Sequence, residues 1–110
     1  MKKVIVTMEN CEAVAKELVE ELFDKPLRII SFFRGKGVKE EPKKLKSVVR
    51  LISGFTFNNG CLVIPLKPIR NIYWNLNKEK VTIFYLDDGM VMIEREIGSE
   101  KTIFRVIVES

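Results

Sequence analysis

The chain has 110 residues, of which 46% are hydrophobic and 31% charged, and its formal net charge is +4. This length suits one domain with one core, and the apolar content excludes an intrinsically disordered chain. The sequence contains no histidine, which excludes a Ser-His-Asp triad, a Cys-His pair and a histidine zinc site.

The composition also sets expectations for the surroundings of the protein. No apolar run approaches the length of a membrane span, so we expect a single domain over residues 1–110 in the cytoplasm. Cys11 and Cys61 have no metal-ligand spacing and are expected to be free thiols in a reducing compartment. Abundant Lys and Glu without Gln is a composition typical of thermophilic proteins. No cofactor is expected.

The first third of the chain predicts a strand, a helix and a second strand. A contiguous apolar run predicts a strand over Lys3–Met8, and Asn10 is a plausible N-cap for a helix over Cys11–Phe23. The apolar residues of that helix fall on one stripe: Cys11, Val14, Ala15, Leu18 and Leu22. Leu27–Arg34 predicts the second strand. Such a βαβ unit should hold its two strands parallel.

A second helix is predicted over residues 42–53. Pro42 suits the first turn of a helix, and Gly54 suits its end. Apolar residues recur between them at helical spacing: Leu45, Val48, Val49 and Ile52. The basic residues of the segment would then point to solvent.

After Gly54 the apolar period changes from 3.6 to 2. Asn58-Asn59-Gly60 predicts a hairpin turn, and further strands are predicted at the end of this chain: Arg70–Leu76, Lys80–Leu86, Met90–Ile97 and Thr102–Glu109. The predicted fold class is therefore α+β. A βαβα half over residues 1–53 precedes an antiparallel meander over residues 54–110, and two helices cover one face of a mixed sheet.

The positive charge is concentrated in one segment. Residues 25–50 hold nine Lys or Arg and two Glu, a local charge of +7, whereas residues 1–24 carry −3 and residues 51–110 carry zero. Neutralising several phosphates supplies most of the affinity of non-specific nucleic-acid binding. We therefore expect a small nucleic-acid-binding protein that contacts phosphates through a glycine-containing basic loop and the next helix. The predicted contacts are Arg34, Lys36, Lys39, Lys43, Lys44 and Arg50.

Aromatic residues accompany the basic segment. Phe32 and Phe33 precede the loop, and Tyr73 and Trp74 lie in a strand with polar neighbours. Aromatic rings beside basic side chains are typical of surfaces that bind single strands. Because Phe32 and Phe33 point to opposite faces of a strand, at most one of them should be accessible.

The order of elements and the sequence Arg34-Gly35-Lys36-Gly37 are similar to those of the Alba archaeal chromatin proteins, over about half of the chain. This resemblance implies a nucleic-acid partner. The meander after Gly54 departs from the Alba pattern, and no individual residue is carried over. The same glycines do not form a phosphate-binding loop, because GxxxxGK[ST] and GxGxxG both fail after Gly37.

Two other functions remain open. A non-enzymatic protein-interaction or assembly module that forms a homodimer would explain why several strands are apolar on both faces. A metal-dependent nuclease or hydrolase could use the carboxylates of the Asp-Asp-Gly turn and of the strand after it: Asp87, Asp88, Glu94 and Glu96. Such patterns are common on solvent-exposed faces, so a catalytic role is the less favoured interpretation and no metal ligand is assigned.

Overall fold

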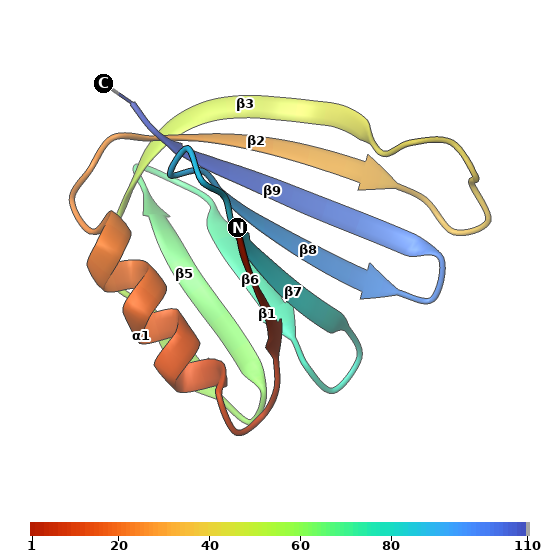
Figure 1. The fold of residues 1–110 in the computed structure, drawn as a ribbon, viewed down its shortest axis with the longest axis horizontal. Helices are drawn as coiled ribbons and strands as arrows, with labels where there is room; N and C mark the ends of the chain where they lie inside the picture. Colours follow the sequence, from red (N-terminus) through yellow and green to blue (C-terminus); the bar gives the residue numbers. More distant parts are fainter. Residues whose placement is uncertain (110) are drawn as a thin grey trace.

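The structure is a computed structural model and describes residues 1–109. Figure 1 shows the arrangement of its elements. In chain order they are β1 (Lys2–Val6), α1 (Cys11–Leu22), β2 (Leu27–Arg34), β3 (Lys43–Ile52), β4 (Thr56–Asn58), β5 (Cys61–Lys67), β6 (Asn71–Asn75), β7 (Lys80–Tyr85), β8 (Val91–Ile97) and β9 (Glu100–Val108).

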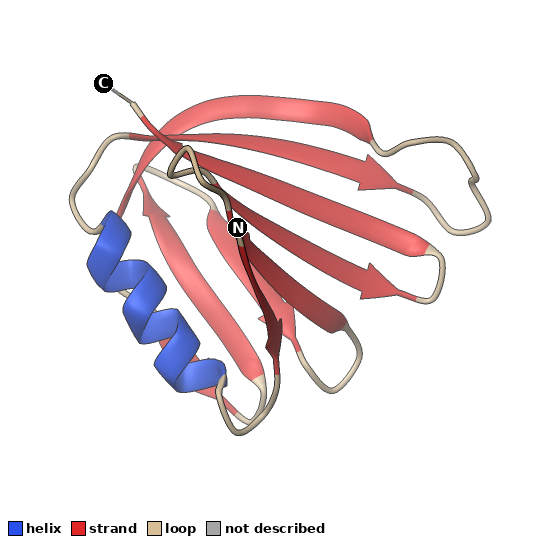
Figure 2. Cartoon of the chain, viewed as in Figure 1, coloured by secondary structure: helices blue, strands red, loops and turns tan. Residues whose placement is uncertain are grey.

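The predicted α+β class is wrong. Among residues 1–109 the chain forms nine strands and one short helix, as Figure 2 shows. The strands form one curved antiparallel sheet, a half-barrel, in the order β1-β7-β8-β9-β2-β3-β5-β4, with β6 paired to β5. The protein is therefore mostly β, and no second helix covers this sheet within the described residues.

The segment predicted as the second helix is the strand β3. It pairs antiparallel with β2 from Leu27↔Arg50 to Phe33↔Lys43. Its apolar spacing fits a helix, but three of its five apolar residues are β-branched: Val48, Val49 and Ile52. Such side chains restrict χ1 in a helix and pack well on a pleated sheet. Pairing with β2 therefore overrides the helical spacing.

The predicted parallel βαβ unit is also wrong. The strands β1 and β2 are not neighbours, because β1 pairs with β7 while β2 lies between β9 and β3, all antiparallel. Within the described residues, the one parallel contact between extended segments is the isolated bridge Phe23↔Ile52. Periodicity identified β1 and β2 as strands but carried no information about their partners. The Alba-like order of elements is absent as well.

The first helix is confirmed in position and in its buried face. Cys11, Ala15, Leu18 and Leu22 are buried, together with Val19. Asn10 occupies the predicted N-cap position, but its side chain does not make the expected capping hydrogen bond. Its Oδ1 instead accepts from the Thr7 amide at 2.8 Å, and its Nδ2 donates to the Ile5 carbonyl at 3.0 Å. Asn10 thus closes the turn that leads into α1.

The antiparallel hairpins of the second half are confirmed. The strands β4 and β5 pair around Asn59 and Gly60, both of which have positive φ angles of 48° and 83°. The strands β7, β8 and β9 form the predicted meander. No helix among residues 1–109 is long and apolar enough to cross a membrane.

Six neighbouring strands of the sheet, in the order β1-β7-β8-β9-β2-β3, have two distinct faces, which the register defines. We call the face that carries the core the concave face; one of its cross-strand rows runs Lys2, Tyr85, Val91, Val106, Ile29 and Val48. The opposite, convex face carries the row Lys3, Phe84, Met92, Arg105, Ile30 and Ser47. Figure 1 shows α1 and the β2–β3 loop at opposite ends of the molecule.

Candidate functional site

A groove opens on the concave face toward the β2–β3 end. Its main hollow has a volume of about 380 Å³, within the range of ligand-binding pockets. Five strands of the sheet (β2, β3, β6, β8 and β9) and the residue before β6 line it: Ser31, Phe33, Leu45, Lys46, Arg70, Asn71, Tyr73, Arg95, Thr102 and Phe104. The residues come from segments far apart in the sequence.

Two smaller hollows adjoin the main one, and Phe33 lines all three. The second, of about 270 Å³, lies beside the β2–β3 loop and includes Arg34 and Lys43. The third, of about 250 Å³, includes Glu79 and Glu100. We call the three together the groove. Because they share Phe33, they form one elongated surface and not three separate sites.

The charge along the groove is uneven. The charged side chains that line the main hollow are all basic: Lys46, Arg70 and Arg95. The second hollow has two basic residues and one acidic residue, Glu41, whereas the third has two acidic residues and one basic residue. An anionic ligand is therefore favoured in the main and second hollows and disfavoured in the third.

Two aromatic rings are exposed in this groove. Phe33 is 40% exposed and Tyr73 is 52% exposed, and both line the main hollow. Their sequence neighbours are not accessible there. Phe32 lies on the convex face, where the Arg105 guanidinium sits 4.7 Å from the centre of its ring. Trp74 is buried in the core, and its Nε1 donates to the Cys11 sulfur at 3.3 Å.

The ring of Tyr73 rests on a fixed support. The guanidinium of Arg95 lies 4.4 Å from the centre of the Tyr73 ring. Arg95 donates to Glu79, and the two side chains are 11% and 4% exposed. The other carboxylate oxygen of Glu79 accepts from the Asn75 amide at 2.7 Å. Buried charge-assisted contacts of this kind hold side chains in one geometry.

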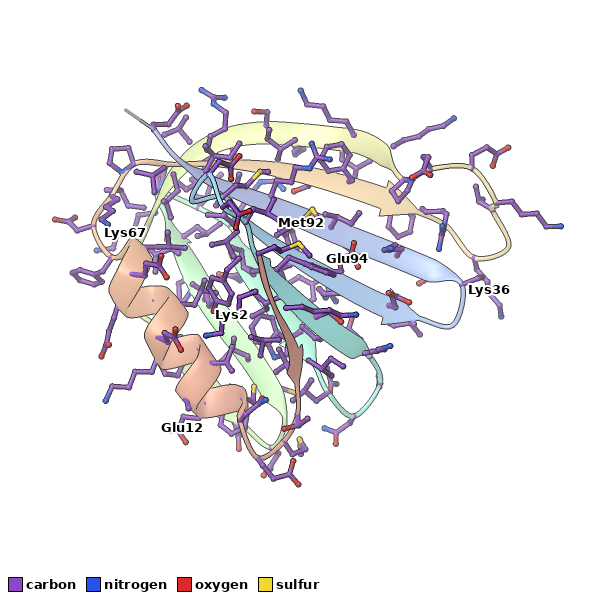
Figure 3. The ribbon with its side chains drawn as sticks, viewed as in Figure 1. Lys2, Glu12, Lys36, Lys67, Met92 and Glu94 are labelled. Atoms are coloured by element: carbon purple, nitrogen blue, oxygen red, sulfur yellow. The ribbon has the colours of Figure 1, made fainter. Side chains whose placement is uncertain are left out.

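Of the predicted contacts, Arg34 and Lys43 line the second hollow. Lys36 and Lys39 are exposed in the β2–β3 loop, and Figure 3 shows Lys36 at the end of the molecule away from α1. The loop is tied to the β8–β9 turn, because the Gly37 amide donates to the Ser99 hydroxyl at 2.8 Å. These four residues therefore lie at one end of the groove.

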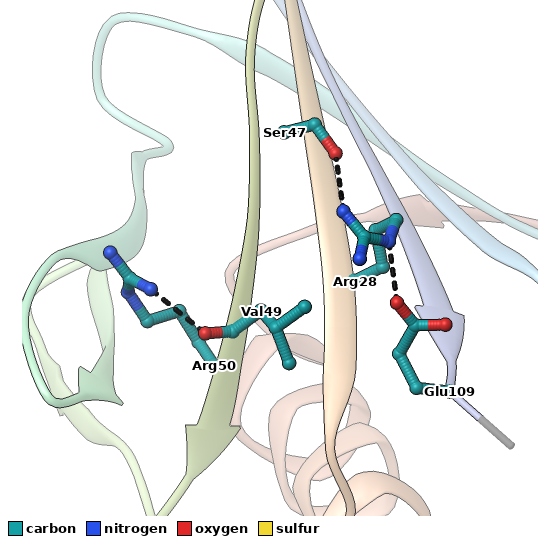
Figure 4. Close-up of polar contacts among 5 residues, drawn as sticks. All are labelled: Arg28, Ser47, Val49, Arg50 and Glu109. Atoms are coloured by element: carbon teal, nitrogen blue, oxygen red, sulfur yellow. Dashed lines mark hydrogen bonds and ion pairs between the residues drawn. The ribbon is translucent and has the colours of Figure 1, made fainter.

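The other two predicted contacts do not lie in the groove. Lys44 pairs with Phe32 in the register and shares its convex face. Arg50 donates to the Val49 carbonyl at 2.8 Å, which Figure 4 shows, and to the Ile69 carbonyl at 3.1 Å. A helix would have placed both on the same face as Lys43. In the strand, Lys44 lies on the convex face, whereas Arg50 shares the concave face with Lys43 but lies at the other end of the β2–β3 pairing.

Three basic residues of the groove were not among the predicted contacts: Lys46, Arg70 and Arg95. A β-bulge shifts the register between Ser31 and Phe32, and it places Leu45 and Lys46 together in the main hollow. The basic segment already contained Lys46, so its charge was a usable signal. Arg70 and Arg95 reach the groove only through the sheet topology, which has no local sequence signal.

The lysines of β3 also have a structural explanation. β3 pairs with β5 only at Leu51 and Ile52, so within the described residues its segment from Lys43 to Arg50 is a free sheet edge. Proteins commonly protect such edges with lysines and bulges, which discourage pairing with another chain. A functional role for Lys43 and Lys46 must therefore be tested apart from this one.

The carboxylates proposed for a metal do not form a cluster. Asp87 and Asp88 lie in the β7–β8 turn, whereas Glu94 is paired with Lys101 at 3.5 Å on the convex face. In residues 1–109 no three Asp, Glu or Cys side chains are grouped as metal ligands. The geometry gives no support to the metal-dependent hydrolase.

The convex face contains the apolar residues that suggested a homodimer. Figure 3 shows Met92 and Glu94 on β8, and Phe84 and Phe32 belong to the same face. Long basic side chains cover part of it. The Lys3 ammonium lies 5.9 Å from the ring centre of Phe84. The Arg105 guanidinium covers Phe32 in the same way, at 4.7 Å. Lysine and arginine stems can cover apolar surface in a monomer. The homodimer remains a prediction.

Comparisons of the chain with protein-family models, with curated proteins and with solved structures found no match. The function must therefore be inferred from the groove itself.

Proposed function

We propose that the protein binds nucleic acid through the groove and the adjoining β2–β3 loop. The observation that carries this proposal is the lining of the main hollow, where every charged side chain is basic and two aromatic rings are exposed. Basic side chains neutralise phosphates, and exposed rings offer faces to bases.

The basic residues form a continuous series. Arg70 and Lys46 line the main hollow, and Lys43 and Arg34 line the second. Lys36 continues the series into the loop. A phosphate backbone that follows these residues would release several counterions, which accounts for affinity without sequence readout. Within this proposal Lys44 and Arg50 make no contact.

A salt series tests the proposal. The logarithm of the association constant of the wild-type protein for fluorescently labelled oligonucleotides should fall linearly with the logarithm of the salt concentration, with a slope set by the number of neutralised phosphates. Fluorescence anisotropy measures this directly. A flat response, or no binding to single strands or duplex at low salt, overturns the proposal.

Charge reversal separates the groove from the overall charge of the chain. The double variant Lys43→Glu, Lys46→Glu should lose most of the affinity, because it places carboxylates where phosphates are expected. It keeps charged residues on the free edge of β3, so edge protection remains. The matched control is Lys16→Glu, Lys25→Glu, which makes the same change of net charge at the α1 end.

The control variant should lose affinity only slightly, through the long-range field. Equal losses in the two double variants would mean that net charge alone drives binding, and would contradict a groove-centred interface.

A further inference from the structure

We infer that the groove is built for single-stranded nucleic acid, with an unpaired base stacked on Tyr73 and a second on Phe33. This inference rests on the proposed function and adds the form of nucleic acid and the residues that select it.

The exposed rings favour single strands over a duplex. Tyr73 is about half exposed, the Arg95 guanidinium lies against its ring, and the residue lines the main and third hollows. A base can stack on such a ring only if its own face is free. In a duplex the faces of the bases are occupied by their neighbours, so aromatic platforms select unstacked, single-stranded segments.

The Tyr73 ring is also held in place before a ligand binds. Glu79 fixes Arg95, and Arg95 lies against the ring of Tyr73. The guanidinium, the phenol ring and an incoming base would form one stack. A ring that is already held in place loses little conformational freedom when a ligand binds, so the stack forms at lower entropic cost. Arg95 and Glu79 therefore act as positioning residues.

The hollows also define a path for the nucleic-acid strand. The three hollows meet at Phe33, so a ligand that fills them must be extended. The acidic third hollow repels phosphates, whereas the other two attract them. The backbone is therefore expected to run from Arg70 past Lys46 toward Lys43 and the loop. Phe33 lies where the two attractive hollows join, and it is placed to stack a second base.

The experiment compares oligothymidylate, oligouridylate and a blunt duplex of about sixteen nucleotides, the upper end of typical single-strand site sizes. Each is labelled with a fluorophore and titrated with protein at low salt. The DNA and RNA arms distinguish the two sources of single strands. We expect both single strands to bind more tightly than the duplex.

Variants of the platform supply the second arm. Tyr73→Ala and Phe33→Ala should each weaken single-strand binding by roughly 5- to 150-fold, the effect of losing one base–aromatic stack. Tyr73→Phe keeps the ring and should bind like the wild type. Phe23→Ala is the matched control, because Phe23 is 52% exposed, as Tyr73 is, but lies at the end of α1. It should leave affinity unchanged.

A photocrosslink gives a readout that needs no variant. Oligonucleotides with bromodeoxyuridine, irradiated in complex with the wild-type protein, should form adducts on the peptides that contain Phe33 or Tyr73. Adducts confined to other peptides, such as that of Phe23, overturn the inference.

The outcomes separate the two proposals. If duplex and single strands bind equally, the aromatic variants match the wild type and the Lys43, Lys46 double variant loses affinity, the single-strand inference fails and the proposed function stands. If no oligonucleotide binds at low salt, both fail. Urea unfolding monitored through the buried Trp74 verifies that each variant is folded.

Discussion

The α1 end and the β2–β3 end of the molecule use the same strands in different ways. Toward α1, the concave face is covered, and Val91, Val106 and Ile29 are buried. Toward the β2–β3 loop, the next rows of the same face leave Phe33 and Lys43 accessible. Hydrogen bonds between neighbouring strands hold the sheet together at the α1 end and at the β2–β3 end. The core of one end can therefore support an open, charged surface at the other.

This difference should appear first in stability. Leu18 of α1 is fully buried, so Leu18→Ala should lower the free energy of unfolding by about 2–5 kcal/mol through lost burial and a cavity. Leu45 in the groove is exposed, so Leu45→Ala should change it by less than about 0.5 kcal/mol. Urea unfolding measures both. Similar losses would mean that the two ends do not differ in packing.

The pair Glu79–Arg95 is the part of the open end that should behave like a core. Removing one partner of a buried ion pair leaves the other charge uncompensated, which costs about 3–5 kcal/mol in fully buried pairs. Because Arg95 keeps slight exposure, we expect Glu79→Ala to cost somewhat less, about 2–3 kcal/mol. Thermal unfolding of Glu79→Ala beside Lys78→Ala, an exposed neighbour, gives the comparison.

If Glu79→Ala unfolds at the same temperature as Lys78→Ala, the support beneath Tyr73 is not fixed by this ion pair. The stacking platform would then have to be held by other contacts.

Thiol reactivity should separate the buried core from its margin. Both cysteines are free, as predicted, but Cys11 is buried and Cys61 is partly exposed. Burial raises the pKa of the Cys11 thiol, against a smaller opposing effect of its hydrogen bond with Trp74. Alkylation at Cys11 requires local opening; an opening free energy of about 3 kcal/mol would slow it roughly a hundredfold relative to Cys61. Mass spectrometry of partly alkylated protein measures the ratio.

Equal alkylation rates would contradict a closed α1 end. Equal rates at Cys11 and Cys61 would show that local opening of α1 exposes Cys11 as readily as Cys61 is exposed.

The smallest expected effect is a dependence on alkaline pH at the α1 end. Burial, and then the carboxylates of Glu17 and Glu21 on α1, raise the pKa of Tyr85 from 10.0 to about 12. The folded state then binds this proton more tightly than the unfolded state does. The contribution of Tyr85 to stability is fully present below pH 10 and is lost as pH rises from about 10 to about 12.

The variant Tyr85→Phe removes this titration, so its unfolding midpoint should decline less than that of the wild type across the same window. An identical decline in the two proteins would show that Tyr85 does not contribute to it.

The sequence predicted the elements with local signals. The α1 stripe, the Asn59-Gly60 turn and the β7–β9 meander depend on periodicity and turn chemistry within a few residues. The pairing of β1 with β7 joins residues about eighty positions apart and has no local signal. The apolar spacing of β3 predicts a helix, whereas its β-branched residues favour a strand, and the pairing with β2 decides between them.

The candidate site was predictable to the same extent. The basic segment and the accessibility of one of two adjacent phenylalanines followed from charge and strand alternation, and Phe33 is the exposed one. The support of Tyr73 by Arg95 could not be predicted, because β6 and β8 meet only in the folded sheet. The bulge at Leu45, which brings Lys46 into the groove, also has no signal in the sequence.

The contact between the Trp74 indole and the Cys11 sulfur has a practical consequence for spectroscopy. Trp74 is the sole tryptophan of the chain, and a thiol against an indole quenches its emission. Departure of α1 from β6 should therefore brighten the fluorescence before solvent exposure shifts it to longer wavelengths. A brightening that precedes the red shift during unfolding would time the release of the helix separately from the loss of the sheet.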